Sequence, residues 1–168
     1  MAEAAASTAA AAVYTLPPYA PRCALTAEPI DVAAVLEEVG DDAAGAVASF
    51  IGTTRCHHGG RRVTKLEYEA HPTMAVATMA AICGEAQAAA GSRLARAVVV
   101  HRTGDVPVRH TSIVIAVSSP HRADALAAVA FIIDAVKARV PVWKKEWYAD
   151  GEGVWKENCE CAWRRRWG

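Results

Sequence analysis

Residues 113–141 read IVIAVSSPHRADALAAVAFIIDAVKARVP and predict a strand followed directly by the clearest helix of the chain. The first five residues are apolar and mostly β-branched, which favours a strand. Ser119 and Pro120 then supply an N-cap and a first helical residue. The helix is expected to end at Pro141, because proline cannot continue it. Spacings of three and four predict its apolar stripe as Leu126, Val129, Ile133 and Val136.

The flanking sequence mixes helices and strands in no strict order. Residues 31–39 form a predicted short helix, with Asp31 as N-cap and Gly40 as stop. A longer helical pattern runs from Pro72 towards Gly91. Strands are predicted at 46–51, 63–68 and 97–100, with a loop at 56–62 and a turn at 103–105. This irregular alternation predicts an α+β fold.

The composition describes a soluble globular domain. The chain has 168 residues, 53% of them hydrophobic, which suits one domain with a real core. Its 18 Lys and Arg balance 18 Asp and Glu, so it lacks the positive field of a general nucleic-acid binder. No apolar run reaches the ~18 residues of a membrane-spanning helix. We therefore expect neither a nucleic acid nor a membrane as partner.

The two ends differ from the middle of the chain. Residues 1–29 begin with an alanine-rich stretch and are expected to form a disordered or extended tail, before a domain at 30–158. Residues 159–168 form a basic C-terminal tail. No basic segment precedes an apolar one, as a secretory signal requires. The odd number of cysteines, five, favours reduced thiols and a cytosolic location.

Lysines near the end of the predicted helix could carry chemistry. Lys137 lies at the edge of the apolar stripe, and Lys144 and Lys145 follow just after Pro141. Such a lysine either extends past the core to solvent or points into a pocket. Clustered ammonium groups lower the pKa of one another, and a lysine with a lowered pKa can act as nucleophile, base or acid near neutral pH.

The start of the same helix is a candidate anion site. A helix N-terminus presents unpaired N–H groups, and His121 and Arg122 add positive charge. The alternative is an ordinary cap with two exposed side chains. Sixteen residues separate His121 from Lys137, which is ~24 Å along a helix. A small ligand cannot touch both in one chain, so we predict a site shared across a symmetric dimer.

Five segments in this order resemble the large, catalytic subunit of molybdopterin synthase. They are 50–55 (FIGTTR), 66–70 (LEYEA), 100–104 (VHRTG), 118–122 (SSPHR) and 137–146 (KARVPVWKKE). The resemblance covers roughly residues 30–157. No single segment decides it; the order and spacing of all five make the match strong.

This resemblance implies an α/β-hammerhead type of α+β fold, with mixed and antiparallel sheets, in a homodimer. Each copy would bind a small ubiquitin-like sulfur-carrier subunit, giving a heterotetramer. The carrier ends in Gly-Gly with a thiocarboxylate, and its tail threads into a pocket. As a sulfurtransferase, the enzyme would move two sulfurs to cyclic pyranopterin monophosphate (precursor Z), making the dithiolene of molybdopterin. The step needs no metal and no other cofactor.

The resemblance also implies which residues act. Lys137 matches the essential lysine of the family, Lys144 a second active-site lysine and Arg55 an active-site arginine. His121 and Arg122 match substrate-binding positions. The matching substrate-contact segments also contain Thr53, Thr54, Lys145 and Glu146. The loop at 56–60, Cys159, Cys161 and the arginines at 164–166 have no clear counterpart.

Other functions are weighed against this one. A non-catalytic dimer could hold a ubiquitin-like tail without a precisely placed Lys137. Arg55 alone could be an ordinary surface arginine. An enzyme that uses a nucleoside triphosphate would need a phosphate-binding loop, and the sequence has no G-x-x-x-x-G-K-[ST] stretch. A metal-dependent hydrolase could use Cys56, His57 and His58, but no second ligand pair accompanies them.

Overall fold

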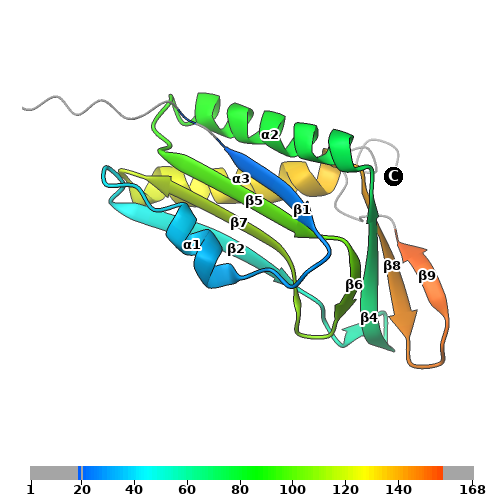
Figure 1. The fold of residues 1–168 in the computed structure, drawn as a ribbon. Helices are drawn as coiled ribbons and strands as arrows, with labels where there is room; N and C mark the ends of the chain where they lie inside the picture. Colours follow the sequence, from blue (N-terminus) through cyan, green and yellow to red (C-terminus); the bar gives the residue numbers. More distant parts are fainter. Residues whose placement is uncertain (1–18, 20, 157–168) are drawn as a thin grey trace, which may run out of the picture.

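The computed structural model describes Tyr19 and residues 21–156, which form two sheets and three helices (Figure 1). The elements, in chain order, are β1 (Arg22–Thr26), α1 (Val32–Glu38), β2 (Ala46–Thr53), β3 (His57–His58), β4 (Arg61–Ala70), α2 (Pro72–Ala89), β5 (Arg96–Arg102), β6 (Gly104–Pro107), β7 (Thr111–Ser119), α3 (Arg122–Arg139), β8 (Val142–Tyr148) and β9 (Gly153–Lys156).

The main sheet has the strand order β1-β5-β7-β2. β1 runs parallel to β5, and the other pairs are antiparallel. α2 and α3 cover one face, and α1 covers part of the other (Figure 1). Along β5, Val99 faces α2 and α3 while Val98 and Val100 face α1, since successive side chains of a strand point to opposite faces. The central residues of both strands, 97–100 in β5 and 113–117 in β7, are therefore all apolar.

The second sheet has the order β3-β4-β8-β9, with β6 also pairing with β4. Its small core consists of Val63, Leu66 and Tyr148. β8 begins right after α3, and the amide N–H of His71, at the start of α2, donates to the Pro141 carbonyl oxygen (3.2 Å). This contact ties the end of α3 to the start of α2. The predicted α+β class with mixed and antiparallel sheets is confirmed.

The predicted start of α3 is wrong. The helix begins at Arg122, with His121 as an N-cap whose side chain makes no capping hydrogen bond. Ser119 instead stays in β7, paired with Ala46, because its place in the sheet is buried and fully bonded. Its hydroxyl donates to the Arg93 carbonyl oxygen (3.2 Å) and accepts the amide of His121 (3.4 Å).

The predicted apolar stripe of α3 is wrong at one position. Val129 and Val136 are buried as expected, but Leu126 is 61% exposed. The helix turns Ala125 and Ile132 to the sheet, both fully buried. Small alanines let the helix approach the sheet closely, and a helix with so many alanines allows several apolar stripes by spacing alone.

Three further strands lie where the sequence predicts a tail, a turn or a loop. β1 lies within the segment that was expected to be an N-terminal tail, and it pairs with β5 at the sheet edge. β6 occupies the predicted turn at 103–105, and the two-residue β3 lies inside the predicted loop at 56–62. Cys159, Cys161 and the arginines at 164–166 lie outside the described residues. No helix of the described part is long and apolar enough to cross a membrane.

Two methionines of α2 test the packing of this helix. Met79 is fully buried against the sheet, whereas Met74 is 54% exposed. We expect Met79→Ala to lower the free energy of unfolding by about 3 kcal/mol, because it leaves a cavity in the core. Met74→Ala, the matched control, should change it by less than about 0.5 kcal/mol. Urea denaturation measures both, and equal losses would contradict the helix orientation.

Candidate functional site

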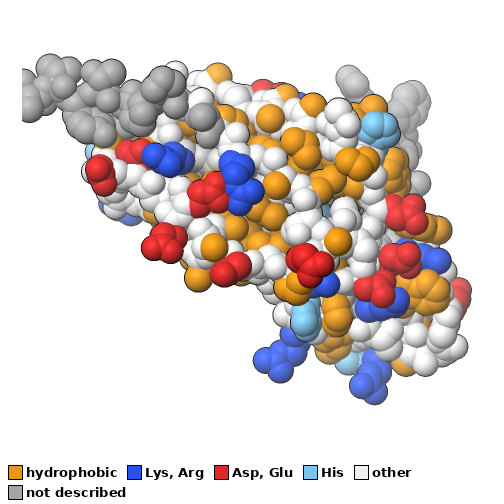
Figure 2. Space-filling view, viewed as in Figure 1, with side chains coloured by type: hydrophobic (Ala, Val, Ile, Leu, Met, Phe, Trp, Pro, Cys, Tyr) orange, Lys and Arg blue, Asp and Glu red, His pale blue; other side chains and the backbone are white. Residues whose placement is uncertain are grey.

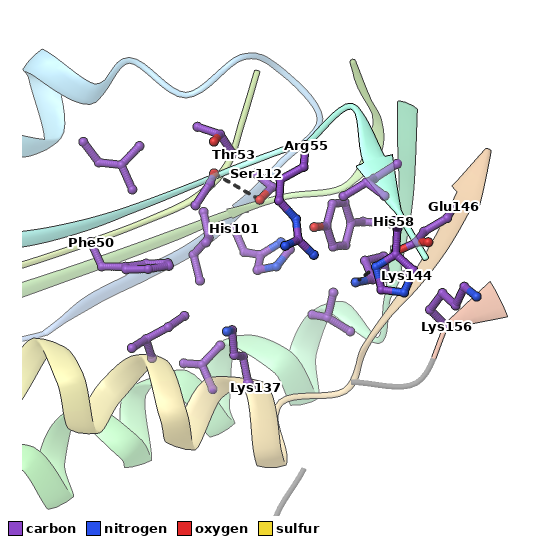
Figure 3. A pocket seen from close by; sticks show the side chains of 18 of the residues that line it. Phe50, Thr53, Arg55, His58, His101, Ser112, Lys137, Lys144, Glu146 and Lys156 are labelled. Atoms are coloured by element: carbon purple, nitrogen blue, oxygen red, sulfur yellow. Dashed lines mark hydrogen bonds and ion pairs between the residues drawn. The ribbon is translucent and has the colours of Figure 1, made fainter. Parts of the chain in front are cut away.

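A cavity of about 520 Å³ lies where the end of α3 meets the main and second sheets (Figure 3). β2, β4, β5, β7, α3, β8 and β9 all contribute side chains to its wall. The apolar part of the wall consists of Phe50, Ile51, Val63, Leu66, Ile113, Ile133, Val136, Val140 and Val142. A cavity of this size, with polar groups gathered at one end, suits a small organic molecule.

Cationic side chains converge on this cavity from separate elements. Arg55 follows β2, Lys137 lies in the last turn of α3, and Lys144 lies on β8. Figure 3 shows these three side chains extending into one space, with Lys156 of β9 at the rim. Positive groups held together in a partly enclosed space favour an anionic ligand or an anionic transition state.

One buried carboxylate accompanies these cations. Glu146 is 3% exposed, and its Oε2 accepts a hydrogen bond from the Tyr148 hydroxyl (2.8 Å). Its Oε1 lies 3.5 Å from the Lys144 Nζ and 3.8 Å from the His58 Nδ1. Lys144, Glu146 and Tyr148 share one face of β8 because they alternate along the strand. Glu146 therefore holds the Lys144 ammonium in the cavity.

A neutral histidine lies at the inner end of the cavity. Burial lowers the pKa of His101 to about 4, so the ring is uncharged at neutral pH. Its Nδ1 donates to the Arg102 carbonyl oxygen (2.8 Å), since a carbonyl can only accept. Within the described part of the chain, no residue donates to its Nε2, which is left as a hydrogen-bond acceptor. The edge of the ring contacts Tyr68, with centroids 4.9 Å apart.

The phenol of Tyr68 completes this inner wall. Burial raises the pKa of Tyr68, and the nearby negative charge of Glu146 raises it further. A hydrogen bond with Ser112 acts in the opposite direction. The phenol is therefore protonated at neutral pH, which makes the inner end of the cavity a set of uncharged hydrogen-bonding groups.

Five of the predicted site residues line the cavity: Thr53, Arg55, Lys137, Lys144 and Glu146. Two others do not. The buried hydroxyl of Thr54 donates to the Val106 carbonyl oxygen (3.2 Å). The ammonium of Lys145 lies 4.4 Å from the centre of the Trp147 ring, on the opposite face of β8 from Lys144.

His121 and Arg122 also lie outside this cavity. Both are exposed at the first turn of α3, whereas Lys137 belongs to its last turn. The two ends of an 18-residue helix are too far apart for one small ligand. Within one chain, the two predicted groups are therefore separate.

The segment at 56–58 forms part of the cavity wall. His57 and His58 line the cavity, and the Cys56 Sγ lies 3.0 Å from the His57 Nδ1. Among the residues that the structure describes, no three His, Cys, Asp or Glu side chains are grouped so that they could hold a metal ion.

Comparison with known proteins relates this chain to a family. The family model described as MoaE protein matches residues 25–139. This chain belongs to the MoaE family. It is 48% identical over 143 residues to molybdopterin synthase catalytic subunit 1 of Aedes aegypti, which is 84% of this chain and 92% of that protein. It is 53% identical over 131 residues to the molybdopterin synthase catalytic subunit of Oryza sativa subsp. indica, 78% of this chain and 66% of that protein.

Solved structures of the MoaE family share the fold. Molybdopterin synthase from Staphylococcus aureus superposes with a TM-score of 0.75 at 34% identity, covering 79% of this chain and 95% of that one. The molybdopterin biosynthesis MoaE protein of Burkholderia ambifaria superposes with a TM-score of 0.69 at 28% identity, covering 89% of this chain and 99% of that one.

Several lining residues were not predicted from the sequence. Tyr68 ends the predicted strand at 63–68 and His101 directly follows the one predicted at 97–100. A polar residue facing inwards at the end of a buried strand was the available signal. His58 and Lys156 carry no local signal, because only the pairing of β3, β4, β8 and β9 brings them to the cavity.

The lowered pKa of His101 predicts how stability depends on pH. The unfolded ring, with a pKa near 6.5, binds a proton that the folded ring excludes until about pH 4. The free energy of unfolding should therefore fall by up to about 3 kcal/mol as pH drops from 7 to 4.

Urea denaturation between these pH values tests this dependence. His101→Asn should flatten it, while His57→Asn, at an exposed histidine, should leave it as in the wild type. The same slope in both variants would contradict the assignment.

Proposed function

We propose that this chain is the catalytic subunit of molybdopterin synthase. It transfers sulfur from the C-terminal thiocarboxylate of a small ubiquitin-like carrier subunit to precursor Z, forming the dithiolene of molybdopterin. The convergence of Arg55, Lys137 and Lys144 in one cavity, in a chain of the MoaE family, carries the proposal.

The cavity suits a reaction that develops negative charge. The thiocarboxylate sulfur forms a bond to an electrophilic carbon of the pterin side chain, the bond from that carbon to its oxygen breaks, and the leaving oxygen accepts a proton. Water then hydrolyses the thioester that joins carrier and pterin, so the carrier leaves with a C-terminal carboxylate and the sulfur stays on the pterin. Arg55 and Lys144 stabilise the charge that builds up, and Lys137 donates the proton. The alternative role of Lys137 is attack on the acyl carbon of the carrier, which would leave an amide between Lys137 and the terminal glycine.

The carrier tail and the substrate must occupy the cavity together. An extended Gly-Gly tail is thin, and it can dock through main-chain hydrogen bonds beside strands. The apolar wall around Phe50 and Val142 accepts the uncharged parts, while the cationic end receives the thiocarboxylate. The free thiols of Cys23, Cys56 and Cys83 are compatible with a reducing compartment, and we place the reaction in the cytosol.

A homodimer would bring together the predicted site residues at the two ends of α3, which are His121 and Arg122 at its start and Lys137 at its end. The helix exposes Leu126 and Phe131, and the neighbouring edge strand β2 exposes Val47 and Ile51. Exposed large apolar side chains on α3 and on the edge strand β2 favour burial against a second copy. Two antiparallel α3 helices related by a two-fold axis would bring the partner's His121 towards Lys137.

Reconstitution with thiocarboxylated carrier and precursor Z tests the proposed reaction. We expect Lys137→Ala to lower the rate of dithiolene formation by at least ~100-fold, because it removes the proton donor. Lys65→Ala is the matched control: this lysine pairs with Asp105 at the surface and should leave the rate unchanged.

The outcomes separate the alternatives. An unchanged rate in Lys137→Ala would move the catalytic role to Lys144 or Arg55. Wild-type protein that binds the carrier tightly but forms no product would instead support a non-catalytic module that holds a ubiquitin-like tail.

Mixing two inactive variants tests the shared site. A chain with Lys137→Ala and a chain with Arg122→Ala should each be poorly active alone. After random mixing, half of the dimers contain one intact site of two, so up to about a quarter of wild-type activity should return. No recovery from mixed dimers that mass spectrometry detects would show that Arg122 of one chain and Lys137 of the other do not form one site.

A further inference from the structure

A second cavity, of about 490 Å³, lies at the end of the main sheet and has no part in the proposed reaction. Its wall is formed by the segment before α1, the end of β5 and the turn that joins β6 to β7. Three of its lining side chains are basic, Arg102, Arg109 and His110, and among the described residues no carboxylate lines it. Its charge is therefore positive and uncompensated within its own wall.

Arg102 points to the opposite side of β5 from His101. Side chains alternate along a strand, so Arg102 continues the face on which Val98 and Val100 pack under α1. α1 is short and does not cover this last position, where Ile30 and Arg102 line the cavity instead. The second cavity is thus separated from the first by the sheet itself.

The guanidinium of Arg102 has an unmet hydrogen bond. Its Nε donates to the Ala27 carbonyl oxygen (3.2 Å), but its Nη1 is buried and has no partner among the described residues. No carboxylate of the described residues pairs with it either. A half-buried guanidinium whose charge no described carboxylate balances is costly, so an anion in this cavity would stabilise it.

The turn at Arg109 and His110 is held in place by backbone hydrogen bonds. The Arg109 amide donates to the Thr54 carbonyl oxygen (2.9 Å), and the Thr54 amide donates to the His110 carbonyl oxygen (3.1 Å). Figure 2 shows basic and histidine side chains at the lower edge of the molecule, where Figure 1 places this turn. The two exposed side chains thus stand at the mouth of the cavity that Arg102 lines from inside.

We propose that this second cavity is an oxyanion-binding site for a phosphate group. The guanidinium of Arg102 supplies positive charge from inside, and Arg109 supplies it at the mouth, where the His110 ring adds a hydrogen-bonding group. A guanidinium matches the geometry of phosphate oxygens, and a bound phosphate would balance the charge that no described carboxylate pairs with.

Titration with inorganic phosphate, followed by two-dimensional ¹H–¹⁵N NMR of the full chain, tests the proposal. The background carries Arg55→Ala and Lys144→Ala, so that the first cavity contributes little. We expect saturable shifts at the amides of Arg109, His110 and Thr111. Acetate at equal ionic strength should bind more weakly, because it carries a single charge and two oxygens.

Arg109→Gly is the decisive variant. Arg109 has a left-handed backbone (φ 70°), which glycine adopts without strain, so the substitution removes the charge and keeps the turn. We expect phosphate affinity to fall about tenfold, the value of one charge-assisted hydrogen bond. Arg62→Gln, at an exposed arginine outside both cavities, is the matched control and should bind phosphate like the background protein.

Arg102→Gln provides a second test, with its melting temperature measured in parallel. We expect it to weaken binding by at least as much as Arg109→Gly does. The proposal is overturned if the three amides show no saturable shift, or if Arg109→Gly and Arg102→Gln bind phosphate as tightly as Arg62→Gln. Equal affinity for acetate and phosphate would also overturn it, because it would indicate charge screening alone. The test needs neither carrier nor precursor Z, so its result is independent of the proposed reaction.

Discussion

The packing of α3 on the main sheet is the constraint on which the site depends. Ala125 and Ile132 are fully buried, so the helix lies close to the sheet and its rotation is set by core packing. This rotation directs Lys137, one turn from the helix end, towards the space between the two sheets. Pro141 then ends the helix, and the chain turns at once into β8 with Lys144.

The cavity holds like charges together because the fold supplies their position. Arg55, Lys137 and Lys144 come from three elements that are fixed by hydrophobic cores rather than by attraction between the cations. Glu146 compensates part of this charge, and burial keeps His101 neutral. A site assembled in this way is ready for an anion before the anion arrives, which is the property that electrostatic catalysis requires.

Elements with strong local signals in the sequence were predicted well, and elements that depend on tertiary contacts were not. Asp31 and Gly40 predicted α1 within one or two residues, because a cap and a stop act locally. Leu126 was misplaced because α3 is apolar on several faces, and only contact with the sheet selects the buried one. β1 was missed because a short edge strand without alternation is recognised only by its partner β5.

The sequence by itself determined the α+β class and the long helices, which follow from residue type and short-range spacing. Five ordered segments also carry the resemblance to a family, and this resemblance singled out Arg55, Lys137 and Lys144 as candidates. Only the tertiary structure decided that Lys144 faces the cavity while Lys145 faces Trp147, and that His101 and Arg102 serve opposite sides of β5. The physical reason is strand alternation: adjacent residues point in opposite directions, and only the packed core shows which direction is inward.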